Sequence, residues 1–521
     1  MAGVVSVPER TLKKINSYIL PQWKVCFFAG FIVGLIAHLY KITNWLPNWD
    51  SIVFRYDSQN MIGLGRWFLP VVCSFSSFYD LPFLNGIIAI IFHAIGAVCI
   101  CKMFKVEKSV TAFIIGGTIV SFPTVTSVMM YNYVADGYSI AFFFSVLAAV
   151  FMTSDRPKYY LSSILIALAV GIYQAYITVT ITLVLLWIID RIIYSDDNPK
   201  EISKKVLYIF ISGLAGVIVY ALILKILLLV IPVELSDYQG INSSLSLSNI
   251  DIRASLYSIK ETFINCFFDF SEGANVHNVL NIIVAAIAFG YSLFYVIANK
   301  IYRSPLKVLI LVLVGVMLVI GAGVLAFVNA GVDYHNLMLM GYATFYLVFL
   351  LLYEKRKNKS GNFNAARCWT VLSLSLVIIF NQIVISNVSY HKAQIAYEKS
   401  YGILIRISDR IDRTPKADGC DEILVIGSLD NSSDYSVTLS PNITGITDGY
   451  IIRADDESVG QSVLCSALND YCDKKYKFIS GDRKKDFLKK SEVAEMKVWP
   501  EDDCVRVVDN IIVIKLGAEG E

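Results

Sequence analysis

Residues 206–231, VLYIFISGLAGVIVYALILKILLLVI, decide the fold class of this chain. The stretch contains one charged residue, Lys225, and it is longer than the about 20 mostly apolar residues that a helix needs to cross a bilayer. A helix also satisfies its own backbone hydrogen bonds in hydrocarbon, where water is absent. The stretch therefore predicts a membrane-spanning helix.

Similar apolar stretches occupy most of the chain, and together they predict eleven spans. The predicted spans begin near Trp23, Leu84, Val110, Gly137, Tyr159, Ala175, Val206, Val279, Leu306, Asn336 and Trp369. The fifth and sixth are separated only by residues 171–174. No small-residue cleavage site follows the first stretch, so we expect a retained helix and no signal peptide.

Charged residues are few, and they are unevenly distributed. They make up only 17% of the 521 residues, whereas a soluble domain carries roughly a quarter. They are sparse from about residue 23 to residue 390 and dense thereafter. The sequence therefore predicts a multi-span membrane domain, residues 1–390, and a water-soluble domain, residues 391–521. The formal net charge of +2 argues against a nucleic-acid partner.

Lysine and arginine predict how the chain is oriented in the membrane. Every second connection between the spans is basic, and these residues resist transfer across the membrane. The residues concerned are Arg10, Lys13, Lys14 and Lys24; Lys102, Lys105 and Lys108; Arg156 and Lys158; Arg191, Lys200, Lys204 and Lys205; Lys300, Arg303 and Lys307; and Lys355, Arg356, Lys357, Lys359 and Arg367. We expect a plasma-membrane protein with a cytoplasmic N-terminus and an extracytoplasmic C-terminal domain. Residues 41–83 and 232–278 would then form outer loops.

The C-terminal domain is predicted to be a small α/β domain. Its predicted helices are 392–413, 461–471 and 483–496, and its strands are 422–426 and 476–479, with a hairpin of 505–508 and 511–514 around Asp509-Asn510. It has no phosphate loop and no nucleophile motif, which favours a recognition or lid module over a catalytic one. The ten cysteines of the chain form no CxxC pair and no zinc-type spacing, so no metal site is predicted. Four of them lie in this domain, where pairing and unpaired core positions both stay open: Cys420, Cys465, Cys472 and Cys504.

The first outer loop concentrates polar and aromatic side chains. It contains Asn48-Trp49-Asp50-Ser51, then Arg55-Tyr56-Asp57, and then Gly63-Leu64-Gly65-Arg66-Trp67. Each feature has an ordinary explanation, because Trp and Tyr populate membrane interfaces and a charged loop residue is most often solvated. Two carboxylates and two arginines in one short loop nevertheless suit a binding or catalytic site.

Three further turns at the same predicted face also carry polar side chains. They are residues 130–136, with Tyr133 and Asp136, residues 173–176, with Tyr173 and Gln174, and residues 333–336, with Asp333 and His335. Polar groups at helix ends near the bilayer are costly to desolvate, so solvent, partners or a ligand must satisfy them. The convergence of four such segments on one face favours a site.

The order of these motifs resembles that of the GtrII-like bacterial membrane glucosyltransferases, which are related to the GT-C glycosyltransferases. The resemblance rests on the Trp49-Asp50-Ser51 loop that ends in Gly63-x-Gly65-Arg66-Trp67, on Tyr133, Asp136 and Tyr138, and on Tyr173-Gln174. It covers about the first 350 residues. It implies a GT-C-like membrane fold and an enzyme that transfers a sugar, typically glucose, from a polyprenyl-phosphate carrier to a cell-surface glycan such as an O antigen or a teichoic acid. It implies no metal and no other cofactor.

The resemblance also implies roles for individual residues. Asp50 or Asp57 would act as the general base on the acceptor hydroxyl, with Asp50 favoured because it follows the first span more closely. Arg55 and Arg66 would stabilise the leaving phosphate. The sugar would be bound by the remaining candidates, which are Trp49, Trp67, Tyr133, Asp136, Tyr173, Gln174, Asp333 and His335. The last two stand where a basic residue is expected for the carrier phosphate, so the donor sugar stays open.

Other functions fit a polytopic chain as well. A transporter or lipid-sugar flippase usually carries charges inside its spans and internal repeats, and this sequence shows few such charges and no evident repeat. A polysaccharide polymerase or ligase relies on arginines in a long outer loop, and residues 232–278 contain only Arg253. An adhesion protein would leave the polar outer face of the membrane domain unexplained.

Overall fold

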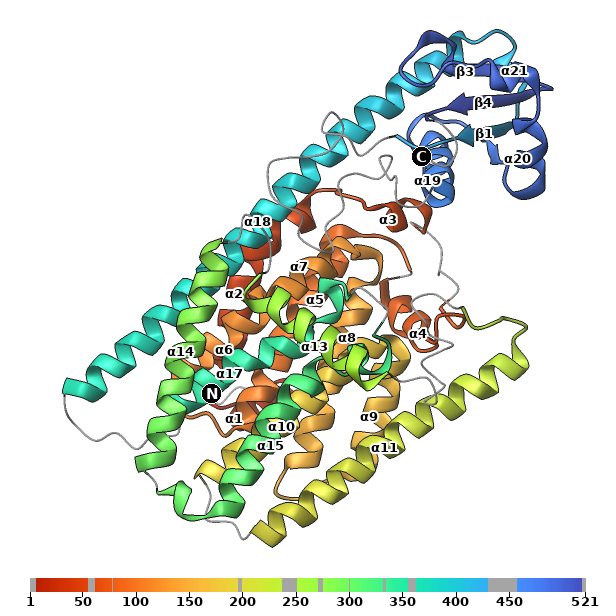
Figure 1. Cartoon of the computed structure of the whole chain (residues 1–521). Helices are drawn as coiled ribbons and strands as arrows, with labels where there is room; N and C mark the ends of the chain where they lie inside the picture. The colour runs from red at the N-terminus through yellow and green to blue at the C-terminus, as the bar shows by residue number, and fades with distance from the viewer. Residues whose placement is uncertain are drawn as a thin grey trace.

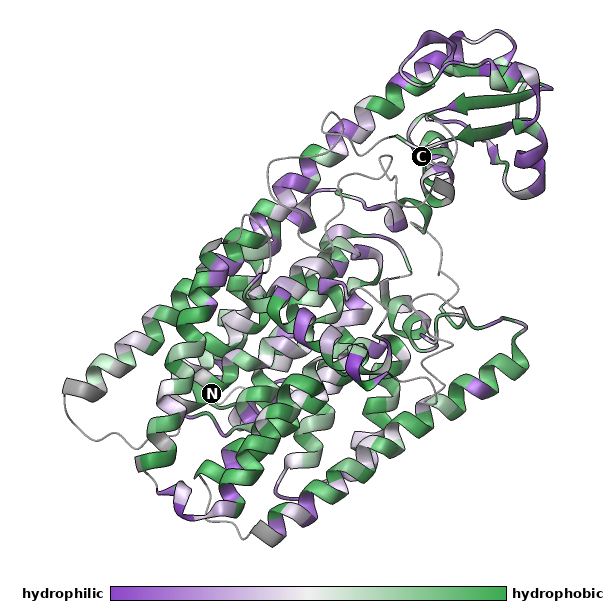
Figure 2. Cartoon of the chain, in the orientation of Figure 1, coloured by the Kyte–Doolittle hydropathy of each residue, from purple (hydrophilic) through white to green (hydrophobic). Residues whose placement is uncertain are grey.

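The computed structural model describes residues 6–54, 61–76, 78–194, 199–236, 251–269, 275–298, 300–330, 334–354, 362–429 and 457–517 (Figure 1). Long helices form a bundle, and a small domain with a mixed sheet lies at one end of it. Apolar residues dominate the long helices, whereas hydrophilic residues gather in the C-terminal domain and at the helix connections (Figure 2). The structure confirms a helical membrane protein with a small C-terminal domain that contains a sheet.

Eight of the described helices are long and apolar enough to cross a membrane. They are α2 (Pro21–Thr43), α5 (Pro82–Met103), α8 (Asn132–Thr153), α10 (Ile177–Tyr194), α11 (Pro199–Val230), α14 (Asn275–Ala298), α15 (Pro305–Ala322) and α18 (Asn362–Arg413). A ninth span results if α6 (Ser109–Ser121) and α7 (Pro123–Met130), which meet at an angle of 41°, are counted as one. The described helices therefore give eight or nine candidate spans where the sequence predicts eleven.

Three of the predicted spans account for this difference. The third bends because Phe122 precedes Pro123 and takes an extended ψ of 138°, which a helix cannot continue. The fifth, α9 (Tyr159–Ile172), has only 14 residues. The tenth is divided into the 3₁₀ turns η6 (Asn336–Met338) and η7 (Met340–Thr344) and the short helix α17 (Phe345–Glu354).

Shorter elements connect the spans. At the end of the bundle nearest the C-terminal domain lie α3 (Trp49–Val53) and α4 (Leu69–Cys73), with η1 (Ser74–Ser76) after α4 (Figure 1). The other connecting elements are α1 (Val7–Tyr18), η2 (Gln174–Tyr176), α13 (Ile252–Phe267), η5 (Ile301–Arg303) and α16 (Val324–Val328).

Helix α18 joins the two parts of the molecule. It runs without a break for 52 residues, which confirms the helix predicted over residues 392–413. Polar contacts fix it to the bundle. Gln382 accepts a hydrogen bond from Ser121 at 2.8 Å, and the hydroxyl of Ser386 lies 2.7 Å from that of Thr126. The domain boundary predicted at residue 390 falls within this helix. We propose that it divides the chain into two units that pack separately, with the helix running from one into the other.

The C-terminal domain contains a four-stranded sheet with the strand order β2-β1-β4-β3. Its strands are β1 (Glu422–Ile426), β2 (Lys477–Phe478), β3 (Val505–Val508) and β4 (Ile511–Lys515), and its further helical elements are η8 (Ala417–Gly419), α19 (Glu457–Tyr471), α20 (Gly481–Leu488), α21 (Ser491–Ala494) and η9 (Asp502–Cys504). The single helix predicted over 483–496 is therefore divided into α20 and α21.

The strand predictions for this domain are confirmed. β1 pairs in parallel with β2 and β4, and β3 pairs antiparallel with β4. Asp509 and Asn510 make the predicted tight turn, with φ of 49° and 63°. Arg483 of α20 makes two hydrogen bonds with the carboxylate of Glu422 in β1, at 2.7 and 2.8 Å, which holds the pKa of Glu422 below its ordinary value.

At the opposite end of the bundle, the Glu354 carboxylate caps helix α6. Its Oε1 accepts hydrogen bonds from the backbone N–H groups of Glu107 and Lys108, at 2.8 and 3.1 Å, and its Oε2 accepts one from Thr111 at 2.5 Å. Glu354 ends α17 and is buried. The side chain therefore satisfies donors at the start of α6 that have no partner within their own helix.

We predict that Glu354→Ala lowers the free energy of unfolding by about 1–3 kcal/mol, because buried donors lose their acceptor. A thermal melt of the purified protein in detergent measures the effect. Glu107→Ala, which removes an exposed carboxylate beside the same helix, is the matched control and should leave the melting temperature unchanged. Equal melting temperatures for both variants would contradict the capping role.

Candidate functional site

The Gly63-Leu64-Gly65-Arg66-Trp67 segment is fixed by hydrogen bonds from two helical elements. Gln174 donates to the carbonyl of Leu64 at 2.9 Å, and the Tyr220 hydroxyl donates to the carbonyl of Gly65 at 3.0 Å. Gly65 has a φ of +71°, and a Cβ added there would lie 2.7 Å from the Tyr220 oxygen and 2.9 Å from Gln174 Nε2. Only glycine fits this position, because both the backbone conformation and the space exclude a side chain.

This arrangement holds the Arg66 guanidinium against tyrosine rings. Arg66 Nη1 donates to the Tyr138 hydroxyl at 3.1 Å, and its Cζ lies 4.7 Å from the centre of the Tyr173 ring. The Tyr138 and Tyr173 rings stack with centroids 4.5 Å apart. A cation over an aromatic face is favourable, and a guanidinium is a group that suits an anionic oxygen.

Tyr133 is within electrostatic range of both Arg66 and Asp50. The Tyr133 phenol interacts electrostatically with the side chains of both residues. Asp50 is half-buried in α3, whereas Tyr133 is buried in the first turn of α8. The structure thus brings together a carboxylate from the first loop, an arginine from the glycine motif and tyrosines from two spans.

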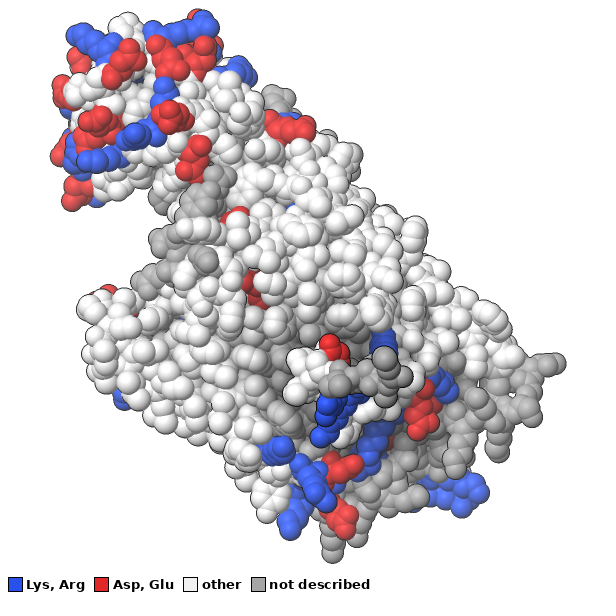
Figure 3. Space-filling view, turned by 180° about the vertical axis from the view of Figure 1, so that it is seen from behind, with Lys and Arg blue, Asp and Glu red and all other residues white. Residues whose placement is uncertain are grey.

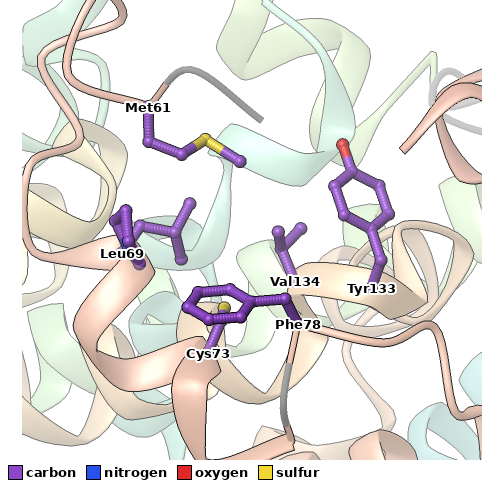
Figure 4. Close-up of a pocket in the computed structure, with 7 residues that line it drawn as sticks. Met61, Leu69, Cys73, Phe78, Tyr133 and Val134 are labelled. Carbon is purple, nitrogen blue, oxygen red and sulfur yellow. The ribbon is translucent and has the colours of Figure 1, made fainter. Parts of the chain in front are cut away.

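Tyr133 also borders a narrow apolar pocket (Figure 4). Met61, Leu69, Cys73, Phe78 and Val134 line it, together with Pro70. Its volume of about 10 Å³ admits no more than about one water molecule. The Tyr133 hydroxyl points away from Leu69 and Cys73 in Figure 4, so the apolar pocket supports the ring while the polar end faces elsewhere.

The two tryptophans predicted to contact the sugar lie in different surroundings. Trp49 packs against the hydrophobic cluster of the C-terminal domain. Trp67 lies over Gly171, where an added Cβ would come within 2.7 Å of the indole. The indole N–H of Trp67 and the hydroxyl of Tyr176 are buried and make no hydrogen bond within the described residues. The Arg66 region therefore keeps polar atoms that a ligand can satisfy.

Asp136 and His335 contact different elements. Asp136 is buried, and its Oδ1 accepts hydrogen bonds from the Gly137 backbone at 2.9 Å and from the Cys73 thiol at 3.8 Å. The carboxylate therefore faces α4. The His335 ring packs edge-on against Tyr131, with centroids 5.8 Å apart, so the late part of the chain reaches the junction of α7 and α8.

Three predicted site residues lie outside the described part of the chain. They are Arg55, Asp57 and Asp333. Their roles remain predictions from the sequence.

A buried polar cluster near the first loop escaped the sequence analysis. Lys41, 1% exposed at the end of α2, donates to the carbonyl of Leu46 at 2.9 Å and interacts electrostatically with Asp80. Asn132 in turn donates to Asp80 Oδ1 at 2.6 Å. An ionisable residue at the end of a span is a signal of function, and Lys41 was treated only as a loop boundary. Tyr220 was missed because a lone tyrosine in an apolar helix has an ordinary explanation at the interface.

A second pocket lies between the end of α18 and β3. It is open, has a volume of about 810 Å³ and is lined by charged residues. These residues form ion pairs with one another: Arg410 with Asp502, Arg413 with Asp409 and Arg506 with Asp503. Among the described residues, no group of three or more His, Cys, Asp or Glu side chains is placed to hold a metal ion. The Arg66 cluster remains the stronger candidate site.

Fold and site together define a multi-span membrane protein with a cationic, tyrosine-rich site at the end of the bundle nearest the C-terminal domain. The model of the family described as Glucosyl transferase GtrII matches residues 39–352, which is more than half of the chain. The chain belongs to this family and is a glycosyltransferase. No curated protein and no solved structure shows a significant match.

We predict that Gly65→Ala lowers glycosyltransfer at least tenfold, because the added methyl group strains the backbone and displaces Tyr220 and Gln174. Sugar transfer per amount of folded protein in isolated membranes measures the effect. Gly213→Ala is the control, since nothing lies within 4 Å of a Cβ added at that position in α11. Equal activity of the two variants would show that the Gly65 conformation is dispensable.

Proposed function

We propose that this glycosyltransferase moves glucose from a polyprenyl-phosphate carrier to a cell-surface glycan on the outer face of the plasma membrane. The observation that carries the proposal is the Arg66 guanidinium held on Tyr138 and Tyr173, in a cluster where Asp50 and Arg66 both interact electrostatically with Tyr133. The family match supports glucose, and the position of the site at one end of membrane helices suits a lipid-borne donor. Alternatives from the same glycan pathways, a polymerase, a ligase or a flippase, gain no comparable support.

The reaction needs a base beside the acceptor hydroxyl and a cation beside the leaving phosphate. The acceptor hydroxyl oxygen attacks the anomeric carbon, the bond from that carbon to the phosphate oxygen breaks, and the phosphate leaves with the electron pair. Asp50 accepts the hydroxyl proton. Arg66 stabilises the negative charge of the phosphate, because its guanidinium donates hydrogen bonds while its face is held on Tyr173.

The remaining candidates bind the sugar or position the groups that do. Tyr133 interacts electrostatically with both the base and the cation, and Tyr138 and Tyr173 fix the arginine. Gln174 acts through the backbone of Leu64, so its amide is a positioning group. His335 reaches the cluster through Tyr131 and is a further candidate for donor contacts.

We infer the orientation in the membrane from the distribution of charges. On the face shown in Figure 3, charged residues gather on the C-terminal domain and at the opposite end of the molecule, and the surface between is mostly uncharged. The basic connections predicted to be cytoplasmic include Lys105, which follows the end of α5, whereas the loop with Asp50 and Arg66 precedes the start of the same span. We therefore place the site and the C-terminal domain outside the cell.

We predict that Asp50→Asn lowers transfer by about 10²–10⁴-fold, because the amide keeps the shape of the carboxylate and cannot accept the proton. The loss is measured as transfer of radiolabelled glucose from polyprenyl phosphate to host membranes. The Asp57→Asn variant is assayed in parallel. Asp155→Asn is the control, because Asp155 is exposed and pairs with Lys105.

The outcomes separate the parts of this proposal. Loss of transfer only in Asp57→Asn would move the base to Asp57, and retained transfer in both variants would refute a carboxylate base in this loop. A wild-type protein that transfers no glucose from this donor would refute the donor.

A further inference from the structure

We propose that the C-terminal domain positions the catalytic carboxylate, with Trp45 and Tyr471 as the positioning residues. The proposal rests on the assignment of Asp50 as the base and goes beyond it. It gives the domain a role in the chemical step that differs from acceptor recognition.

The first loop is inserted into the core of the C-terminal domain. Ile52, on the same short helix as Asp50, is 2% exposed and belongs to the hydrophobic cluster of that domain, beside residues of α18, α19 and the sheet. Trp45 and Trp49 are half-buried against the same cluster. The Trp45 indole donates a 2.6 Å hydrogen bond to the hydroxyl of Tyr471, which lies 426 residues further along the chain.

The geometry of α3 explains how this contact reaches Asp50. Successive residues of a helix are about 100° apart, so Trp49 and Ile52 share one face and Asp50 lies on the other. The first face packs on the C-terminal domain, and the second carries the carboxylate that interacts with Tyr133. The face that holds the helix is thus separate from the face that reacts.

The membrane domain holds the same segment from its other side. The buried Lys41 ammonium donates to the carbonyl of Leu46, and Asn48 caps α3 by accepting a 2.8 Å hydrogen bond from the Ser51 backbone. The segment between α2 and α3 is therefore fixed to the bundle at its start. The Trp45–Tyr471 contact fixes it to the C-terminal domain, so both domains determine where Asp50 lies.

The test compares Tyr471→Phe with Trp45→Phe, which remove opposite partners of one hydrogen bond and keep an aromatic side chain at each position. Each variant should lower kcat about tenfold and leave KM for radiolabelled glucosyl polyprenyl phosphate unchanged, because the base is displaced while the donor site stays intact. The double variant should be no slower than either single variant, since both lose the same interaction. Tyr476→Phe, which removes a hydroxyl in the same domain, is the control and should keep full activity.

Three results would overturn this role. They are an unchanged kcat in both single variants, a rise in KM alone, or additive losses in the double variant. The Asp50→Asn variant separates this inference from the proposed function. If Asp50→Asn abolishes transfer while Tyr471→Phe has no effect, only the positioning role is wrong; if Asp50→Asn is fully active, the catalytic assignment is wrong.

Discussion

The site depends on the contact between the Arg66 guanidinium and the Tyr173 ring within the membrane bundle. A cation–π contact of this kind contributes about 0.5–2 kcal/mol. An unpaired charge at this position would cost more, so the tyrosines and the backbone bonds around Gly65 are needed together. The backbone that carries this charge is held in place by three groups: Gly65 with its positive φ, the Gln174 amide and the Tyr220 hydroxyl.

The sequence predicted the parts of the structure that local physics determines. Long apolar stretches gave the spans, and β-branched stretches with a two-residue turn gave the hairpin at Asp509-Asn510. The tenth predicted span differed, because hydropathy does not reveal that residues 336–344 form 3₁₀ turns. The pairing of Arg66 with Tyr138 and Tyr173 joins three segments far apart in sequence, and the predicted topology and the motif resemblance indicate only that these segments lie at one face.

Contacts between distant segments also explain what sequence reasoning missed. Trp49 packs on the C-terminal domain, a contact between segments far apart in sequence that motif order does not reveal. Lys41 was expected at a loop boundary, and it is a buried ammonium near Asp80. The uninterrupted α18 places the C-terminal domain over the first loop, and this placement creates both the shared core at Ile52 and the Trp45–Tyr471 bond.

Transfer to a surface glycan requires the Asp50–Arg66 end of the bundle and the C-terminal domain to face away from the cytosol. A membrane-impermeant maleimide, applied to intact cells and compared with the labelling of the wild-type cysteines, tests this most directly. A cysteine at the exposed position of Lys485 should label in intact cells, and one at the exposed position of Arg156 should label only after permeabilisation. The reverse pattern would place the site in the cytosol and contradict transfer to a surface glycan.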